Sequence, residues 1–181
     1  MAYGDSKAAL FSDELIAALN LLPLSATVTA TKDDLSIGGA TVADLAARVA
    51  SDLASRPAQD GMSYQHVLIT VGANEVSTLP AEAAWKANLA TVIDAINAKW
   101  PAAKVYVALP WRRNYPTECN SLATWIASVI STRGAWAFVG PDERIYLENG
   151  DNGTTYTYDG IHPNAAGELV AATQWQAVMG Y

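Results

Sequence analysis

The stretch HVLITVGANE, residues 66–75, contains a change of pattern that indicates how the chain folds. Its first six residues are mostly apolar and β-branched, as in a strand buried on both faces of a sheet. The next four, Gly72–Glu75, change to glycine and polar residues, which is typical of a turn. A strand buried on both faces needs covering layers on both sides, so this stretch predicts a sheet packed between helices.

The rest of the chain repeats this alternation. Three further β-branched runs predict strands at 26–30, 104–109 and 135–139. Apolar residues at helical spacing lie between the runs and after the last one, and they predict helices over 42–53, 85–100, 122–130 and from 165 to the C-terminal region. Strand–helix alternation is typical of a parallel sheet covered on both faces. We therefore expect one three-layer α/β/α domain that comprises residues 1–181.

Capping residues mark the ends of these helices. Thr41 and Asp44 have the spacing of a capping box before the first predicted helix, and Asn164 can cap the last one. Pro101 and Gly134 are placed to end the second and third.

Composition excludes several classes of protein. Of 181 residues, 51% are hydrophobic and 16% charged, which fits a folded domain and not a disordered chain. The net charge of −7 argues against a nucleic-acid partner, which would require a basic surface. No membrane span or signal peptide is visible, and localisation stays open, an exported or virion-associated origin included.

The thiol and imidazole content limits metal and redox chemistry. Cys119 is the single cysteine, so no internal disulfide can form, and the two histidines are too few for a nitrogen–sulfur zinc site. The acidic stretch ENGDNGT, residues 148–154, admits a calcium loop or a plain polar turn, and the plain turn is favoured because the spaced carboxylates of a calcium loop are incomplete. We expect no metal.

A serine, a histidine and an aspartate occur in segments predicted to meet at one sheet edge. Ligands of parallel sheets bind at the carboxyl ends of the strands, where Ser6 and the DGIHPN segment would lie. A serine nucleophile needs a base, and an imidazole base needs a carboxylate to orient it. Asp159 and His162 are three positions apart, a spacing that on a helical turn puts both side chains on one side. This arrangement predicts a Ser6–His162–Asp159 triad.

Acyl transfer also needs hydrogen-bond donors for the oxyanion of the tetrahedral intermediate. Gly39 can present a bare backbone N–H, and Asn74 offers a side-chain amide. The backbone N–H of Ser6 is the third candidate, with the start of a helix after it as support.

The four segments that carry these residues resemble the signature blocks of the SGNH hydrolases, also called the GDSL esterase/lipase family. The segments are GDS at 4–6, GGAT at 38–41, GANE at 72–75 and DGIHPN at 159–164. The resemblance implies that Ser6 is the nucleophile, Gly39 and Asn74 are oxyanion donors, His162 is the base and Asp159 orients it. It also implies a flavodoxin-like sheet of five parallel strands in the order 2-1-3-4-5, and no cofactor.

The chain departs from the family pattern at two places near its start. Lys7 follows the serine, where the family usually has an aliphatic residue. Only Met1–Tyr3 precede the GDS segment, so the first strand is expected to be very short and to pair beside the strand at 66–71.

These residues favour a serine esterase that removes short acyl groups, above all acetyl, from a carbohydrate or another small ester. A lipase or thioesterase shares the chemistry, and a non-catalytic binding module of the same fold is the alternative from another class. Trp111 and Arg112, after the strand at 104–109, are the candidates for a substrate-binding rim. The other interpretation places Trp111 in the core and leaves Arg112 and Arg113 solvated.

Overall fold

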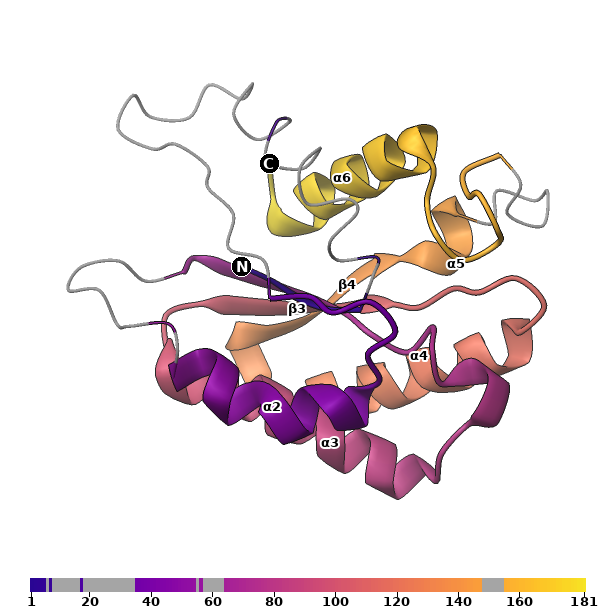
Figure 1. The fold of residues 1–181 in the computed structure, drawn as a ribbon. Coiled ribbons are helices and arrows are strands. Elements are labelled where there is room, and N and C mark those ends of the chain that lie inside the picture. Colours follow the sequence, from indigo (N-terminus) through magenta and orange to yellow (C-terminus); the bar gives the residue numbers. More distant parts are fainter. Residues whose placement is uncertain (6, 8–16, 18–34, 55, 57–63, 148–154) are drawn as a thin grey trace.

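The computed structural model describes residues 1–5, 7, 17, 35–54, 56, 64–147 and 155–181. Strands and helices alternate along it, as expected (Figure 1). The strands are β1 (Ala2–Gly4), β2 (His66–Thr70), β3 (Lys104–Leu109) and β4 (Ala137–Asp142). The helices are α2 (Val42–Ala54), α3 (Glu82–Lys99), α4 (Pro116–Ser131), α5 (Glu143–Tyr146) and α6 (Ala165–Met179), with 3₁₀ turns η1 (Val76–Thr78) and η2 (Gly134–Trp136).

The described strands form one parallel sheet in the order β1-β2-β3-β4. The strands expected at 66–71 and 104–109 are confirmed. The one expected from 135 begins at Ala137, because Gly134–Trp136 form a 3₁₀ turn first. The strand expected at 26–30 lies outside the described residues. Within those residues the sheet has four strands, and the five-stranded order 2-1-3-4-5 stays a prediction.

The first strand is as short as expected. Ala2, Tyr3 and Gly4 pair in parallel with Leu68, Ile69 and Thr70 of β2. On its other side β1 accepts backbone hydrogen bonds from two residues that precede α2, Leu35 N–H to the Ala2 oxygen and Ile37 N–H to the Gly4 oxygen, each 3.0 Å long. Both edges of β1 are thereby hydrogen-bonded, which a buried strand requires.

Helices cover both faces of the sheet (Figure 1). Helices α2, α3 and α4 lie on one face, and α5 and α6 lie on the other. The core is accordingly split into two clusters, a large one centred on Trp85, Leu89 and Ile126, and a smaller one that includes Trp175 and Tyr106. The three layers agree with the continuous apolar pattern of the strands, which leaves no polar face for solvent.

Two helices begin with the expected caps. The Thr41 Oγ1 accepts from the Asp44 N–H, and an Asp44 carboxylate oxygen accepts from the Thr41 N–H. The Asn164 side chain accepts from the Gly167 N–H at the start of α6. These contacts fix where each helix starts relative to the loop before it. No helix in the described part of the chain is long and apolar enough to cross a membrane.

Candidate active site

Asp159 and His162 form a hydrogen-bonded pair on the loop before α6. The His162 Nδ1 lies 2.8 Å from the Asp159 Oδ2. The backbone N–H groups of Ile161 and His162 both donate to the other carboxylate oxygen, at 2.9 and 2.8 Å. Both carboxylate oxygens are therefore used to hold the imidazole in one orientation, as a base in a triad requires.

The loop that carries the pair is not the helical turn that the three-residue spacing suggested. It is closed by an antiparallel bridge between Thr157 and Pro163 and by a hydrogen bond from Tyr158 N–H to the His162 oxygen. The side chains meet because the loop reverses direction between them.

The environment of Asp159 keeps its carboxylate ionised. Burial by itself would raise its pKa, but the hydrogen bonds from the backbone and ring of His162 and from the Ile161 N–H lower the pKa to about 2. Its side chain is half exposed and that of His162 is 38% exposed. The pair therefore faces solvent, where a substrate can reach it.

Gly39 lies in a tight turn between β1 and α2. The turn is closed by a hydrogen bond from the Ala40 N–H to the Ile37 oxygen, and Gly39 has φ +79°. Nothing lies within 4 Å of the position that a Cβ would take there, so the backbone conformation and not crowding requires glycine.

Asn74 connects the second oxyanion candidate to the first. Its Nδ2 donates to the Ala40 oxygen over 2.9 Å. An amide nitrogen carries two hydrogens, so this contact uses one and orients the other. The segments of Gly39 and Asn74, far apart in sequence, are thus brought together at the ends of β1 and β2.

Ser6 lies outside the described residues, but both of its neighbours are described and buried. Asp5 is 1% exposed and Lys7 2%. The Asp5 Oδ1 accepts from the Thr70 hydroxyl on β2 and from the Lys7 N–H. Gly4 before them allows this approach, because a Cβ there would lie 1.9 Å from the Thr70 oxygen.

Lys7 and Glu143 form a buried ion pair that the sequence did not reveal. The Lys7 Nζ lies 2.5 Å from a Glu143 carboxylate oxygen, and the two side chains are 3% and 4% exposed. The pair also binds both polar backbone groups of Trp111, whose oxygen accepts from Lys7 and whose N–H donates to Glu143. The unusual lysine after the serine was the only sequence signal of this cluster.

Burial raises the pKa of Asp5, which adjoins this ion pair, to about 6, although the Lys7 charge lowers it in part. Glu143 contributes in the same direction as burial, since it is a second negative charge nearby.

Trp111 lies in the core instead of on the expected substrate-binding rim, whereas a rim position for Arg112 stays a prediction. Trp111 is 2% exposed and packs in the smaller core cluster, so its indole faces the interior and offers no open surface for a sugar ring. The Arg112 guanidinium donates to the Ala73 oxygen and lies 5.3 Å above the ring of Tyr115. Arg112, which is half-buried, therefore supports the segment before Asn74.

Arg113, which one interpretation of the sequence left solvated, lies against the Asp159–His162 loop. Its backbone N–H donates to the Gly160 oxygen at 2.9 Å, and its side chain donates to the Asp159 backbone oxygen at 3.4 Å. A Cβ on Gly160 would lie 2.6 Å from the Arg113 side chain, which shows how closely the two segments pack.

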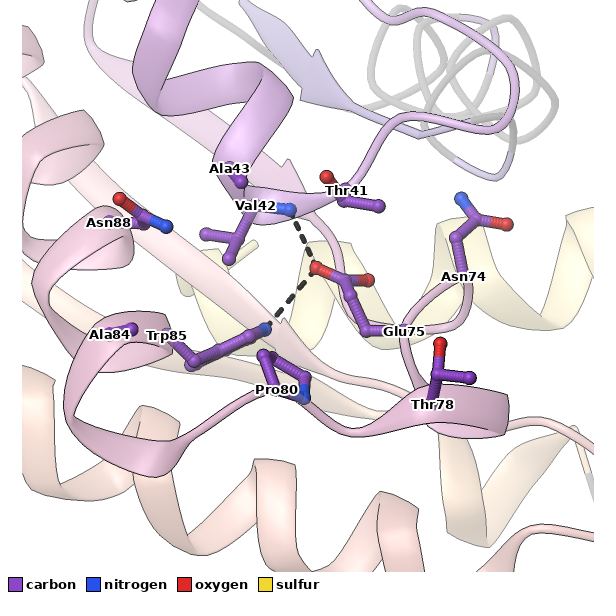
Figure 2. A pocket seen from close by; sticks show the side chains of 10 residues that line it. All are labelled: Thr41, Val42, Ala43, Asn74, Glu75, Thr78, Pro80, Ala84, Trp85 and Asn88. Carbon is purple, nitrogen blue, oxygen red and sulfur yellow. Dashed lines mark hydrogen bonds between the residues drawn. The ribbon is translucent and has the colours of Figure 1, made fainter.

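A pocket of about 240 Å³ adjoins Asn74, between the starts of α2 and α3 (Figure 2). Glu75 projects into it, and its Oε1 accepts from the Val42 N–H and the Trp85 indole N–H. The other carboxylate oxygen has no hydrogen-bond partner among the described residues. Burial raises the pKa of Glu75. Glu75 thereby joins the Asn74 segment to α2 and α3, a role that the GANE motif alone did not indicate.

The remaining histidine lies away from these groups. His66 begins β2, at the opposite end from Asn74, and its Nε2 lies 3.1 Å from the Tyr181 hydroxyl. Within the described residues no group of three or more His, Cys, Asp and Glu side chains could hold a metal ion. The ENGDNGT stretch lies outside those residues.

The comparison with protein families identifies one family. The model of the GDSL-like lipase/acylhydrolase family matches residues 2–170. The comparison with curated protein sequences gave no match.

Several solved structures have a similar fold. The structure of TesA is 24% identical in sequence and has a TM-score of 0.75. The match covers 98% of this chain and 96% of the TesA chain. The acetylxylan esterase Axe2 from Geobacillus stearothermophilus is 16% identical, with coverages of 99% and 92% and a TM-score of 0.76. A family 3 carbohydrate esterase from Clostridium thermocellum is 18% identical, with coverages of 98% and 92% and a TM-score of 0.71.

Proposed function

This chain belongs to the GDSL-like lipase/acylhydrolase family and is a carboxylic ester hydrolase, and on that premise we propose that it removes short acyl groups, above all acetyl, from carbohydrate through an acyl-enzyme. The observation that carries the proposal is the Asp159–His162 pair, with the imidazole fixed through Nδ1 by an ionised, solvent-facing carboxylate. A binding module of the same fold has no physical need for such a pair.

In the proposed reaction, Ser6 Oγ attacks the ester carbonyl carbon while His162 Nε2 takes the hydroxyl proton. The Gly39 and Ser6 backbone N–H groups and the Asn74 amide stabilise the oxyanion. The intermediate expels the alcohol, which receives the proton from His162. Water, activated by the same imidazole, then attacks the acyl-enzyme and releases the carboxylic acid and Ser6.

The pocket beside Asn74 supports a small acyl or sugar group. Its volume of about 240 Å³ lies below the range of about 300–1,000 Å³ that is typical of pockets for larger ligands. Its lining combines apolar residues with five polar ones, which are Thr41, Asn74, Glu75, Thr78 and Asn88 (Figure 2). Acetylxylan and other carbohydrate esterases among the structures of similar fold support the same substrate class.

The test is hydrolysis of p-nitrophenyl acetate, butyrate and octanoate and of an acetylated xylo-oligosaccharide, with Ser6→Ala as control. We expect the acetyl substrates to react fastest, and Ser6→Ala to lower kcat by about 10³-fold or more. A preference for octanoate would identify a lipase or thioesterase instead. If no ester is hydrolysed, or if Ser6→Ala keeps a tenth of the activity, the proposed triad is wrong.

A further inference from the structure

The loop between β3 and α4, residues 110–115, contacts three segments of the candidate site. Three consecutive residues each reach a different one. Trp111 binds the Lys7–Glu143 pair beside Ser6, Arg112 donates to the Ala73 oxygen beside Asn74, and Arg113 donates to the Gly160 and Asp159 oxygens. The β3–α4 loop therefore connects the proposed nucleophile, oxyanion and acid–base segments.

The connection to the nucleophile segment differs from the other two because it is made by buried charges. Arg112 and Arg113 donate to backbone oxygens of the other segments, whereas the backbone groups of Trp111 bind the charged side chains of Lys7 and Glu143. Lys7 in turn is bound through its backbone N–H to Asp5, on the other side of Ser6. Both neighbours of Ser6 are therefore anchored, Lys7 directly to Trp111 and Asp5 to Lys7.

A buried ion pair is a poor device for stability, since removing two charges from water offsets their attraction. It can instead fix one conformation, because the pair is favourable only when both charged groups and their hydrogen-bond partners are correctly placed relative to one another. The pair in this chain satisfies four groups at once: two side chains and the two backbone groups of Trp111.

We propose that Lys7 and Glu143 are positioning residues, which hold the Ser6 turn in register with the β3–α4 loop and, through Arg113, with the Asp159–His162 loop. This inference rests on the proposed triad. It predicts that the pair governs turnover more than stability, and that its loss is felt at the Asp159–His162 loop through Trp111 and Arg113.

The main variant is the double substitution Lys7→Met with Glu143→Gln. It removes both charges of the pair together and keeps a carbonyl acceptor for the Trp111 N–H. Glu143→Asp is the second variant, since it keeps the charge but shortens its reach by one methylene. The matched control is Lys86→Met with Glu82→Gln, which removes an ion pair of 3.3 Å from the exposed side of α3.

Three measurements are made on the full chain: kcat and KM for p-nitrophenyl acetate, the rate of labelling of Ser6 by an alkyl fluorophosphonate, and hydrogen exchange in peptides that cover residues 158–163. Urea unfolding verifies that each variant is folded.

We expect the double variant to lose about 10- to 100-fold in kcat and in labelling rate, with KM within about threefold, because small misplacements of reacting groups are costly. Glu143→Asp shows a smaller loss of the same kind, exchange at 158–163 accelerates in both, and the control changes none of these values.

Wild-type kcat, labelling and exchange in the folded variants would overturn the proposal. If the double variant does not fold, Glu143→Asp decides by the same criteria. If the wild-type chain itself neither hydrolyses esters nor is labelled, the proposed function fails. The exchange measurement then decides positioning alone: acceleration at 158–163 supports it, and unchanged exchange overturns it.

Discussion

Two carboxylate clusters of this protein use similar chemistry in opposite surroundings. Asp159 beside His162 is half exposed, and hydrogen bonds lower its pKa to about 2 against the effect of burial. Asp5 beside the Lys7–Glu143 pair is buried, and desolvation raises its pKa to about 6 although Lys7 lies nearby. Solvent and backbone donors keep the first carboxylate charged and available for reaction. The interior makes the Asp5 carboxylate costly to ionise, and the buried polar groups around it hold segments together.

The largest effect is expected at the exposed pair. Asp159→Asn keeps the shape of the side chain but replaces the charge with an amide, which favours the wrong imidazole tautomer. We expect kcat for p-nitrophenyl acetate to fall by about 10³- to 10⁴-fold, with a melting temperature close to that of the wild type because the pair is exposed. A variant that retains a tenth of the wild-type kcat would show that Asp159 does not orient the base.

The next largest effect is expected at the buried cluster, and it concerns stability. A pKa raised from 3.8 to about 6 means that the folded state binds a proton more tightly than the unfolded state. The stability that Asp5 contributes is therefore fully present below about pH 4 and is lost as pH rises through 6. Asp5→Asn keeps the acceptor for Thr70 and Lys7 but does not titrate.

We thus expect the free energy of unfolding of Asp5→Asn, relative to wild type, to rise by an amount on the order of 3 kcal/mol between pH 4 and pH 8. Urea unfolding at pH 4, 6 and 8 measures it, and the difference between the two proteins cancels the titration of other groups. A difference that stays constant with pH would mean that Asp5 is not the titrating group.

The smallest effect is expected at Arg112, which belongs to neither cluster. Arg112→Ala removes the hydrogen bond to the Ala73 oxygen, which supports the Asn74 segment. We expect a loss of less than about tenfold that is equal for p-nitrophenyl acetate and for an acetylated sugar, because the contact is to the protein. Loss confined to the sugar would restore Arg112 to the substrate-binding rim that the sequence suggested.

The local sequence determined most of the fold and the segments of the site. Apolar runs and capping residues predicted β2, β3, α2 and α6. This was possible because the spacing of apolar residues and helix capping both depend on neighbours along the chain. The DGIHPN segment predicted the Asp159–His162 pair for the same reason, since both residues lie on one short loop.

Only the tertiary structure decided what lies between these segments. The partner of Lys7 is 136 residues away at Glu143, and Trp111 is 104 residues from Lys7. Nothing in a local pattern distinguishes a lysine that will be buried and paired from one that remains in water, or a tryptophan that will face the core from one that faces a ligand. Those outcomes depend on which surfaces the sheet and helices bring together, and burial and pairing are properties of that assembly. The sequence by itself thus determined the fold class and the candidate chemical groups, whereas the packed structure decided how those groups are held in register.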